Sequence, residues 1–579
     1  MSAEIARLIA QVKEQPDIWE RWQADDAVAS SIERVWTSSR FVATSCVRAP
    51  QLLDALIAAG LLKRPLADDE FAADLAASVQ GTSEPEILDS LRRFRRRHMV
   101  RIAWRDLAGW AELDETLREL TALADACIRF AYSYAYEQLT GRYGVPRGEA
   151  SGEPQPMLIF GMGKLGGGEL NFSSDIDLVF LYPEEGQTDG ARSIDNAEFF
   201  LRLGQKVTQI LATPTVEGFV YRVDLRLRPF GDSGRLAVSF PAFENYLQQH
   251  GRDWERYAYV KARAITAQEH YPSLYDEVLR PFVYRRYLDF SVFESLRDMK
   301  AMIAREVERR ELKDNIKLGP GGIREIEFIV QAFQLIRGGA DPRLQRREIN
   351  AVLPRLVGHR LLRSDVVTEL LESYRFLRRV ENRLQEWDDE QTHHLPQDEE
   401  HRARLAFSLG MPDWTALAAQ LELHRGRVAG HFAQMVFGPV GGSDIADPAA
   451  RALDLESAPE DLELAVRNLG FEDPAPICTA LDTLRASAYY RRLDATGRRR
   501  LHELLPRLLR KVAATESPPT TLGRLFKILE MIGGRTVYLA LLNENAIALK
   551  RLVELVAHSQ FLADQIAMHP LLLDELIDE

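Results

Sequence analysis

Two aspartates one residue apart are the residues of this sequence best suited to chemistry. Asp175 and Asp177 lie in GMGKLGGGELNFSSDIDLVFLY, residues 161–182, after a glycine-rich turn and at the start of an apolar run. Side chains two residues apart on a strand point to the same face, so both carboxylates are predicted to project together. Adjacent like charges are unfavourable unless a cation neutralises them, and hard oxygen ligands suit Mg²⁺ or Mn²⁺. The pair therefore predicts a divalent cation site.

A third carboxylate, Asp224, lies in the alternating segment FVYRVDLRLRP. On an extended strand it would share a face with Arg222, Arg226 and Arg228, and a carboxylate among arginines suits a site where metal and phosphate meet. Residues 195–213 are predicted as a crossover helix, so a βαβ-like unit would bring Asp224 beside the pair. Three carboxylates would then hold two metal ions. The alternative is that the aspartate pair flanks a turn and that Asp224 only pairs with arginines.

The glycine turn GMGKLG fits the GxGxxG fingerprint of dinucleotide-binding folds, but that fingerprint needs a long helix directly after the glycines. Here a strand is predicted about ten residues later, and the GK[ST] end of a P-loop is missing. We therefore predict a phosphate cradle formed by backbone N–H groups from Gly163 onward and by the ammonium of Lys164. The hydroxyls of Ser173 and Ser174 would add contacts.

The elements that must position these residues are mostly helices. Apolar residues recur at intervals of three and four over 28–62, 112–143, 291–310, 323–337, 365–388 and 415–437. Strands are predicted only at 157–161, 176–182 and 218–228. Residues 147–156 are expected to be a flexible lead-in to these strands, and 437–450 a linker. The sequence thus predicts a mainly α protein with one embedded α+β domain.

Several polar residues in the helical part are further candidates. In GPGGIREIEFIVQAFQLI, Glu325 falls on the apolar side of the predicted helix and Glu327 on its polar stripe. A carboxylate on an apolar face should be paired or functional. Either Glu325 or Glu327 reaches the active site, or Glu325 forms a buried pair with an arginine. Glu381 and Arg383 are similar candidates, and His393–His394 are interpreted as part of a solvated loop.

Composition limits the partners of the chain. It has 579 residues, too many for one core, and its net charge of −13 makes nucleic acid an unexpected partner. No apolar run reaches the roughly 18 residues that a membrane span needs. Cys46, Cys127 and Cys478 are far apart and odd in number, as expected for reduced thiols in the cytoplasm. The basic run RRFRRRH at 92–98 is expected to face solvent or to pair with nearby acids.

A long-range repeat is also present. Residues 39–57 align without gaps with residues 559–577, and nine of nineteen positions are identical. Composition alone predicts about one match, and the alternative is coincidence between two amphipathic helices. A second copy of the glycine and aspartate motif would fall beyond residue 579, so the repeat predicts the front part of a longer, internally duplicated protein.

Four blocks resemble a known enzyme family: GMGKLGGGELNFSSDIDL, VDLRLRPFGDSG, GPGGIREIEFIVQ and YRFLRRVENRLQ. A glycine turn, Ser-Asp-x-Asp and a third Asp on a later strand resemble the nucleotidyltransferase superfamily that includes DNA polymerase β. More closely, the blocks are similar to the bifunctional glutamine synthetase adenylyltransferase/adenylyl-removing enzymes, which carry two such domains in tandem. Similarity to the first copy, whose motif ends SSDID, implies phosphorolytic removal of AMP from a tyrosine of glutamine synthetase, with release of ADP.

The resemblance implies roles for individual residues and partners. The metal ligands would be Asp175, Asp177 and Asp224, holding two Mg²⁺ or Mn²⁺ ions. Phosphate or nucleotide contacts would come from Gly163, Lys164, Ser174, Arg226 and Arg228. Glutamine synthetase would be the substrate protein, PII signal protein and glutamine the regulators, and inorganic phosphate with ADP or ATP the small ligands. The missing second copy argues against adenylylation by this chain. The alternatives are attachment of a nucleotide from ATP or UTP to a protein tyrosine, and a catalytically silent regulatory scaffold.

The implied fold is a DNA polymerase β-like sheet flanked by helical bundles. It would comprise an N-terminal helical region at 1–146 and a nucleotidyltransferase domain at 147–268. A helical bundle at 269–440 would pack on the active site, and 441–579 would be a helical central or regulatory region that begins a second half.

Overall fold

The fold is taken from a computed structural model, in which the chain divides into two compact units. Unit 1 consists of Met1–Arg286 and Met302–Met435, and unit 2 of Tyr287–Ala301 and Val436–Glu579. The residues that the structure describes are 3–79, 81, 83–284, 296, 298–303, 305–306, 312–358, 361–435, 459–532, 537–544 and 546–568. The finer division into four regions stays a prediction.

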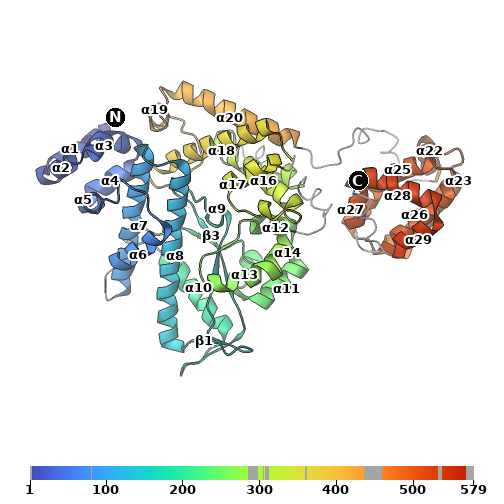
Figure 1. Cartoon of the computed structure of the whole chain (residues 1–579), viewed down its shortest axis with the longest axis horizontal. Helices are drawn as coiled ribbons and strands as arrows, with labels where there is room; N and C mark the ends of the chain where they lie inside the picture. The colour runs from blue at the N-terminus through green and yellow to red at the C-terminus, as the bar shows by residue number, and fades with distance from the viewer. Residues whose placement is uncertain are drawn as a thin grey trace. The chain divides into compact units, whose positions relative to one another are not determined.

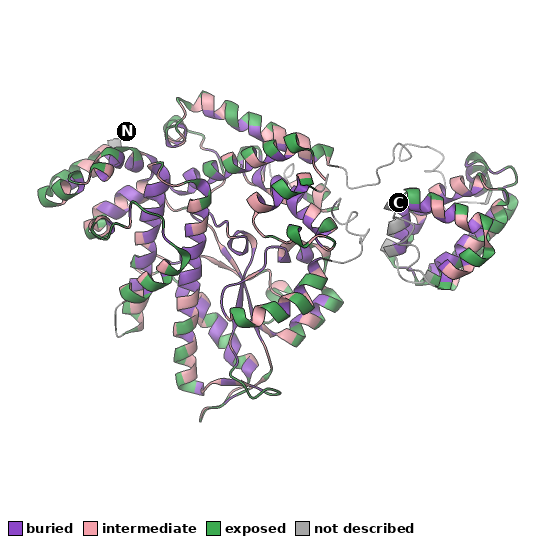
Figure 2. Cartoon of the chain, in the orientation of Figure 1, coloured by how far each residue is buried: buried purple, intermediate pink, exposed green. Residues whose placement is uncertain are grey.

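The first helices of unit 1 enclose much of its hydrophobic core. They are α1 Ala3–Lys13, α2 Pro16–Gln23, α3 Asp26–Ser38, α4 Arg40–Arg48, α5 Pro50–Ala58, α6 Asp68–Ser78, α7 Glu84–Leu107 and α8 Leu113–Tyr143. The core extends from Ile5 to Ile265 and includes the buried Trp22, Trp36 and Trp104. Figure 2 shows α8 buried along its first half and more exposed toward its C-terminal end.

The sheet that carries the aspartates is small and mixed. Its strands are β2 Leu158–Gly161, β3 Ile176–Tyr182, β5 Val223–Asp224, β6 Ala237–Ser239 and β7 Arg263–Ala264. The order is β5-β3-β2-β7, and β6 pairs with the far end of β3. Strand β3 is antiparallel to β2 but parallel to β5 and β6. A separate two-stranded sheet joins β1 Pro146–Gly148, which overlaps the start of the expected flexible lead-in, to β4 Gly186–Thr188.

Helices and short turns complete unit 1. They are α9 Gly163–Gly166, α10 Asn196–Ala212, η1 Gly231–Ser233, α11 Phe240–His250, α12 Asp253–Tyr259, η2 Gln268–His270, α13 Tyr271–Leu274, η3 Tyr275–Leu279, α14 Arg280–Val283, η4 Leu312–Asp314, α16 Ile323–Arg337, η5 Pro342–Leu344, α17 Ile349–Gly358, α18 Ser364–Gln385, α19 Glu399–Ser408 and α20 Trp414–Gln434. Figure 1 shows this largely helical unit with its sheet in the interior. A mainly helical protein with an embedded sheet is therefore confirmed.

Unit 2 is helical over the residues that the structure describes. It contains α22 Pro459–Asn468, α23 Ala475–Ala486, α24 Ala488–Arg492, α25 Ala495–Ala513, α26 Pro518–Ile532, α27 Val537–Glu544, α28 Ala546–His558 and α29 Gln560–Met568. These helices bury a core of their own that is rich in leucine, from Leu462 to Ala567. The predicted linker at 437–450 lies outside the described residues.

The helical periodicity located several of the long helices of unit 1 but missed others, such as α7. The predictions at 112–143, 323–337, 365–388 and 415–437 are confirmed by α8, α16, α18 and α20. The predicted helix at 291–310 lies largely outside the described residues. The prediction of one continuous helix at 28–62 is wrong, because the chain forms three helices there, α3, α4 and α5. Ser39 accepts the N–H of Val42 at 3.1 Å and caps α4, and Pro50, which has no N–H, begins α5.

The repeated segments form corresponding helices. Helices α4 and α29 have nine residues each, at positions offset by the sequence repeat. The N–H of Leu562 donates to Ser559 Oγ at 3.2 Å, as the N–H of Val42 donates to Ser39 Oγ. The second half of the later copy, 569–577, lies outside the described residues. The repeat is thus preserved in local structure where both copies can be compared.

The basic run at 92–98 is mostly paired with acids, which was one of the two expected arrangements. It does not form a solvated face, which was the other. Arg95 is buried and contacts Asp389 at 2.7 Å, and Arg96 contacts Glu217 at 2.8 Å. Arg92 is 1% exposed and donates to backbone carbonyls, including that of Gly218 at 2.9 Å. The positive charges therefore bind α7 to the site region of unit 1.

Two further expectations concern cysteines and membranes. All three cysteines are free thiols, and two of them are buried. Within the described residues, no single helix is both long and apolar enough to cross a membrane. The helices α4 and α5, bent by 95°, would pass that test together by length and composition only.

Candidate active site

Asp177 and Asp224 lie on two neighbouring parallel strands, and Asp175 directly precedes the first of them. Asp177 on β3 is in register with Asp224 on β5, and Ile176 with Val223. Residues in register on adjacent parallel strands face the same side of the sheet, with strands about 4.8 Å apart. Helix α10 connects the two strands along the chain, as the predicted crossover requires. The expected βαβ-like arrangement is therefore confirmed, and it brings Asp224 beside Asp177.

The strand that carries Asp224 is much shorter than expected. The prediction of a strand over 218–228 is wrong, because only Val223 and Asp224 pair in the sheet. The Asp224 carboxylate accepts the N–H of Arg226 at 2.8 Å and so turns the chain directly after β5. The alternating faces therefore do not extend past Asp224. Arg228 instead folds back and donates to the carbonyl of Leu225 at 2.8 Å.

Two arginines neutralise the outer carboxylates. Arg222 Nε donates to Asp175 Oδ1 at 2.8 Å, and its Nη2 donates to Ser173 Oγ at 3.1 Å. Arg226 Nε donates to Asp224 Oδ2 at 2.9 Å, and this pairing holds the pKa of Asp224 below its usual value. The side chain of Arg226 is otherwise exposed, so it is free to exchange Asp224 for another anion. Ser174, the neighbouring hydroxyl, donates to the carbonyl of Asp175 at 3.0 Å.

Asp177 is the inner carboxylate and is packed against the glycine turn. Burial, with the negative charges of Asp224 and Asp175, raises the pKa of Asp177 to about 6. Gly163 has φ of +54°, and a Cβ added there would lie 2.8 Å from Asp177 Oδ2. A side chain at Gly163 would therefore displace the carboxylate. The turn is tight on its other side as well, since a Cβ at Gly166 would lie 2.0 Å from a backbone carbonyl.

Lys164 points into the protein and not into the site. Its Nζ donates to both carboxylate oxygens of Glu381 at 2.9 Å and to Asn171 Oδ1 at 3.0 Å. Burial lowers the pKa of Lys164 to about 7, against the opposing pull of Glu381. Burial alone would raise the pKa of Glu381, but Lys164, His393 and Arg378 hold it well below its usual range. The structure therefore does not bring the expected phosphate ligand Lys164 to the aspartates.

A polar face of α18 holds the loop between the glycine turn and the aspartates. Arg378 Nη2 donates to the carbonyl of Glu169 at 2.7 Å. Farther along α18, Asn382 accepts the N–H of Phe172 at 3.3 Å and Gln385 accepts that of Ser173 at 2.9 Å. Together with Glu381 these residues follow the spacing of one helix face. Ser173 Oγ also donates to the carbonyl of Asp389 at 2.9 Å, which joins the loop to the segment that follows α18.

The two glutamates of α16 have different surroundings. Glu325 is buried, and its Oε2 accepts the N–H of Gly321 at 3.1 Å, so it stabilises the turn before α16. Glu327 lies 3.7 Å from Lys261 Nζ. Burial favours the neutral acid, but Lys261, Lys164 and Lys317 lower the pKa of Glu327. Glu327 therefore belongs to the charged cluster behind the glycine turn, and Glu325 to the turn that starts the helix.

Arg383 and the histidine pair are also placed. Arg383 is buried and donates to Asp106 Oδ2 at 2.6 Å and to Glu386 Oε2 at 2.7 Å, which ties α18 to α7. The interpretation of His393–His394 as a solvated loop is correct only for His394, which is exposed. His393 Nδ1 lies 3.0 Å from Glu381 Oε1, because the loop after α18 folds back over the helix.

Lys317 and Gln391 are site residues that the sequence analysis missed. Lys317 acts electrostatically on both Asp177 and Glu327. Gln391 lines the cavity over the aspartates, from the loop after α18. The available signal for Lys317 was its position two residues before the block that begins with GPGG. No local pattern marks Gln391.

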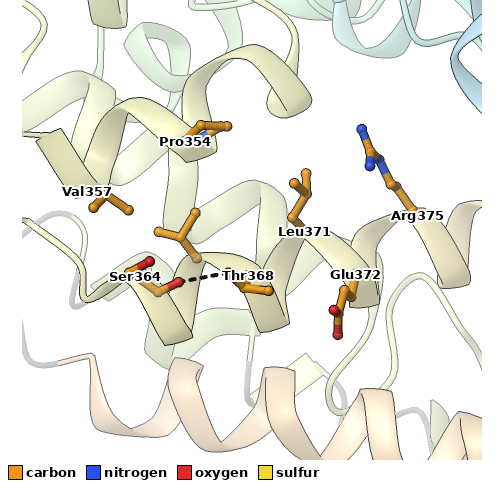
Figure 3. Close-up of a pocket in the computed structure, with 8 residues that line it drawn as sticks. Pro354, Val357, Ser364, Thr368, Leu371, Glu372 and Arg375 are labelled. Carbon is orange, nitrogen blue, oxygen red and sulfur yellow. Dashed lines mark hydrogen bonds between the residues drawn. The ribbon is translucent and has the colours of Figure 1, made fainter.

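Two surface cavities differ in the ionisable residues that line them. A shallow cavity of about 470 Å³ is lined by Asp175, Arg222, Val223, Asp224, Leu225, Arg226, Arg228, Asp232 and Gln391. A second cavity, of about 520 Å³, lies on α17 and α18 (Figure 3). Its ionisable residues already have partners, since Glu372 pairs with Arg427 at 3.3 Å and Arg375 with Asp114 at 3.6 Å. Only the first cavity combines several arginines with carboxylates.

The donor set fits a hard cation by chemistry, but the ligands are not gathered around one point. Among the residues that the structure describes, no three Asp, Glu, His or Cys side chains are grouped to hold a metal ion. Arg222 and Arg226 pair with Asp175 and Asp224 in this arrangement. A cation would have to replace these guanidinium groups. The two metal ions therefore stay a prediction.

Family comparisons agree with the class of site that this geometry suggests. Residues 29–276 match the family described as glutamate-ammonia ligase adenylyltransferase. Residues 297–436 match the family described as GlnD PII-uridylyltransferase. The sheet with its aspartates and the helices α16 and α18 thus both match families named for nucleotidyl transfer.

The chain is similar over nearly its whole length to proteins described as bifunctional glutamine synthetase adenylyltransferase/adenylyl-removing enzyme. It is 48% identical over 557 residues to that of Thioalkalivibrio sulfidiphilus, 50% over 552 to that of Nitrosococcus oceani and 47% over 558 to that of Pseudomonas putida. These alignments cover 94–95% of this chain and 57% of each relative. The family resemblance is confirmed, and the chain spans less than three fifths of the length of these relatives.

Proposed function

We propose that this chain is a nucleotidyltransferase that removes AMP from an adenylylated tyrosine of glutamine synthetase by phosphorolysis. The observation that carries the proposal is the register of β3 and β5, which sets Asp224 beside Asp177. The SSDID ending of the motif and the relatives' printed activities support the adenylyl-removing direction.

The proposed reaction exchanges one bond to phosphorus for another. An oxygen of HPO₄²⁻ forms a bond to the α-phosphorus of adenylyl-tyrosine as the bond from that phosphorus to the tyrosine oxygen breaks. The proton of the phosphate passes to the tyrosine oxygen, so the products are ADP and the free tyrosine. Such transfers depend mainly on positioning and charge neutralisation.

The three aspartates would hold the divalent cations of the reaction, Mg²⁺ or Mn²⁺. Bound there, such ions supply positive charge to the transferred phosphoryl group. Arg222 and Arg226, released from Asp175 and Asp224, would then turn to the phosphate oxygens, because a guanidinium binds either anion. Gly163 keeps the space that Asp177 occupies.

The second candidate is the forward direction, attachment of AMP or UMP to a protein tyrosine. Two observations favour keeping it: the relatives' name includes an adenylyltransferase, and residues 297–436 match a uridylyltransferase family. The same three carboxylates would serve either direction. From the resemblance to the family, we infer that PII signal protein and glutamine would regulate the activity. The remaining alternative, a catalytically silent scaffold, applies if neither direction of transfer is found.

The test is release of ADP from adenylylated glutamine synthetase in the presence of phosphate and Mg²⁺. We expect phosphate-dependent ADP release from the wild-type chain and at least about a thousandfold less from Asp177→Asn, since one missing charge in such a site costs several kcal/mol. Label transfer from ATP to unmodified glutamine synthetase would instead support the forward direction. Binding of neither nucleotide nor Mg²⁺ by a folded protein would support the scaffold.

A further inference from the structure

Gln391 is the neutral polar side chain that lines the cavity over the aspartates. The other lining residues are three arginines, three aspartates and two aliphatic residues. Each arginine forms an ion pair with an aspartate of the same cavity, as Arg222 does with Asp175 at 2.8 Å. Gln391 is exposed, and among the residues that the structure describes its amide has no hydrogen-bond partner. Its donor and acceptor atoms are therefore available to a ligand in the cavity.

The loop that carries Gln391 is held on both sides of this residue. Before it, the carbonyl of Asp389 accepts a hydrogen bond from Ser173 Oγ at 2.9 Å. After it, the carbonyl of His393 accepts the N–H of Ile316 at 2.9 Å. These bonds hold the backbone around Gln391, whereas its side chain is open to the cavity. A side chain presented from a fixed backbone needs less ordering when a ligand binds, so less of the binding free energy is lost.

The amide of Gln391 differs chemically from the charged groups around it. A guanidinium group has donors alone and an ionised carboxylate has acceptors alone, whereas an amide has both. Among the described residues that line the cavity, only Gln391 carries a donor beside an acceptor. One edge of adenine offers the N6 amino donor beside the N7 acceptor, and the amide of Gln or Asn matches both. The arginines suit phosphate oxygens instead, because hydrogen bonds between charged groups are the stronger ones.

We propose that Gln391 binds the adenine base of the adenylyl group, with Oε1 accepting from the N6 amino group and Nε2 donating to N7. The inference rests on the proposed function for the identity of the nucleotide. The cavity volume of about 470 Å³ lies within the range of small-molecule sites. Val223 and Leu225, which also line the cavity and pack against the core, provide apolar surface for the base. Gln391 would thereby favour adenine over a purine that lacks the amino group.

The test compares the binding of ADP with that of purine riboside diphosphate, in which hydrogen replaces the 6-amino group. Titration calorimetry with Mg²⁺ gives both Kd values for wild type, Gln391→Leu and the control Gln397→Leu. Gln397 lies in the same loop, but its amide donates to Asp314 at 3.0 Å and it is not among the residues that line the cavity. We expect wild type and Gln397→Leu to bind ADP about tenfold more tightly than the analogue, which corresponds to roughly 1.4 kcal/mol. Gln391→Leu and Gln391→Ala should bind the two nucleotides equally.

The ratio of the two Kd values separates base recognition from a structural effect, with circular dichroism as the check on folding. A wild-type protein without preference for ADP, or a Gln391→Leu protein that keeps this preference, would overturn the role of Gln391 even if ADP release is observed. Wild-type protein that binds neither nucleotide would overturn it as well. A preference that disappears in Gln391→Leu, in a chain that releases no ADP from adenylylated glutamine synthetase, would support the base site and refute only the proposed reaction.

Discussion

The buried pair of Arg95 and Asp389 gives the sharpest stability prediction. Both Arg95 Nη groups donate to Asp389, at 2.7 and 3.1 Å, and the two side chains are only 6% and 9% exposed. Asp389 also has φ of +54°, a conformation that Asp and Asn tolerate best among residues with a Cβ. Asp389→Asn therefore removes the charge while it keeps the side-chain size and the backbone preference.

The expected cost follows from the charge left behind. Removing one partner of a buried ion pair costs about 3–5 kcal/mol, because the other charge stays buried and unpaired. The rings of Phe219 and Tyr221, 5.3 and 5.4 Å from the guanidinium of Arg95, still attract that charge, so we expect about 3 kcal/mol. That loss lowers the folding equilibrium constant of unit 1 roughly a hundredfold.

The assay measures unfolding in urea, with the hydrogen exchange of backbone amides in α7 and β5 as the readout. Asp388→Asn is the matched control. Asp388 pairs with the partly exposed Arg40 at 3.3 Å, so its substitution should cost less than about 1 kcal/mol. The double variant Arg95→Met with Asp389→Asn should recover much of the lost stability, because no charge then stays unpaired. Equal losses for Asp388→Asn and Asp389→Asn would refute the reasoning.

Three further predictions test other parts of unit 1 and the thiols. Gly163→Ala should reduce ADP release at least about tenfold with a folded protein, because its Cβ would lie 2.8 Å from Asp177 Oδ2; full activity would contradict this. Burial lowers the pKa of His98 despite its contact with Asp74, so folding favours the neutral imidazole. The urea midpoint should therefore fall as pH drops below about 6.5, where the unfolded imidazole gains a proton, and His98→Gln should lessen that fall. Burial raises the pKa of the two core thiols, so a thiol reagent should label only Cys478 quickly before urea is added.

Local patterns were enough to predict β3, α16 and the pairing of Asp224 with Asp177. Strand β3 has the bounds expected from its apolar run, and α16 those expected from its helical period. Because a crossover helix connects β3 and β5, the two strands were expected to lie parallel and side by side. The strand at 218–228 failed for a local reason, since the Asp224 side chain accepts the N–H of Arg226 and competes with extension of the ladder.

The partner of Lys164 could not be predicted from local patterns. A lysine beside glycines is typical of phosphate binding, whereas Glu381 lies 217 residues farther along the chain. From the sequence, Glu381 was named as a candidate similar to Glu325. Which cation it would meet depends on how α18 packs on the sheet, and helix periodicity carries no information about that.

The contacts of α18 also change what must be regarded as the site. The loop 167–174 joins the glycine turn to the aspartates, and several of its backbone and side-chain groups bond to one face of α18. Without those partners, buried N–H groups of the loop would lack acceptors, and each would cost about 1–3 kcal/mol. The position of Asp175 and Asp177 therefore depends on a helix that begins at Ser364, outside the segment that carries the aspartates. It follows that a signal acting on α18 or on the loop after it has a direct physical route to the carboxylates, through Gln385, Ser173 and Arg222.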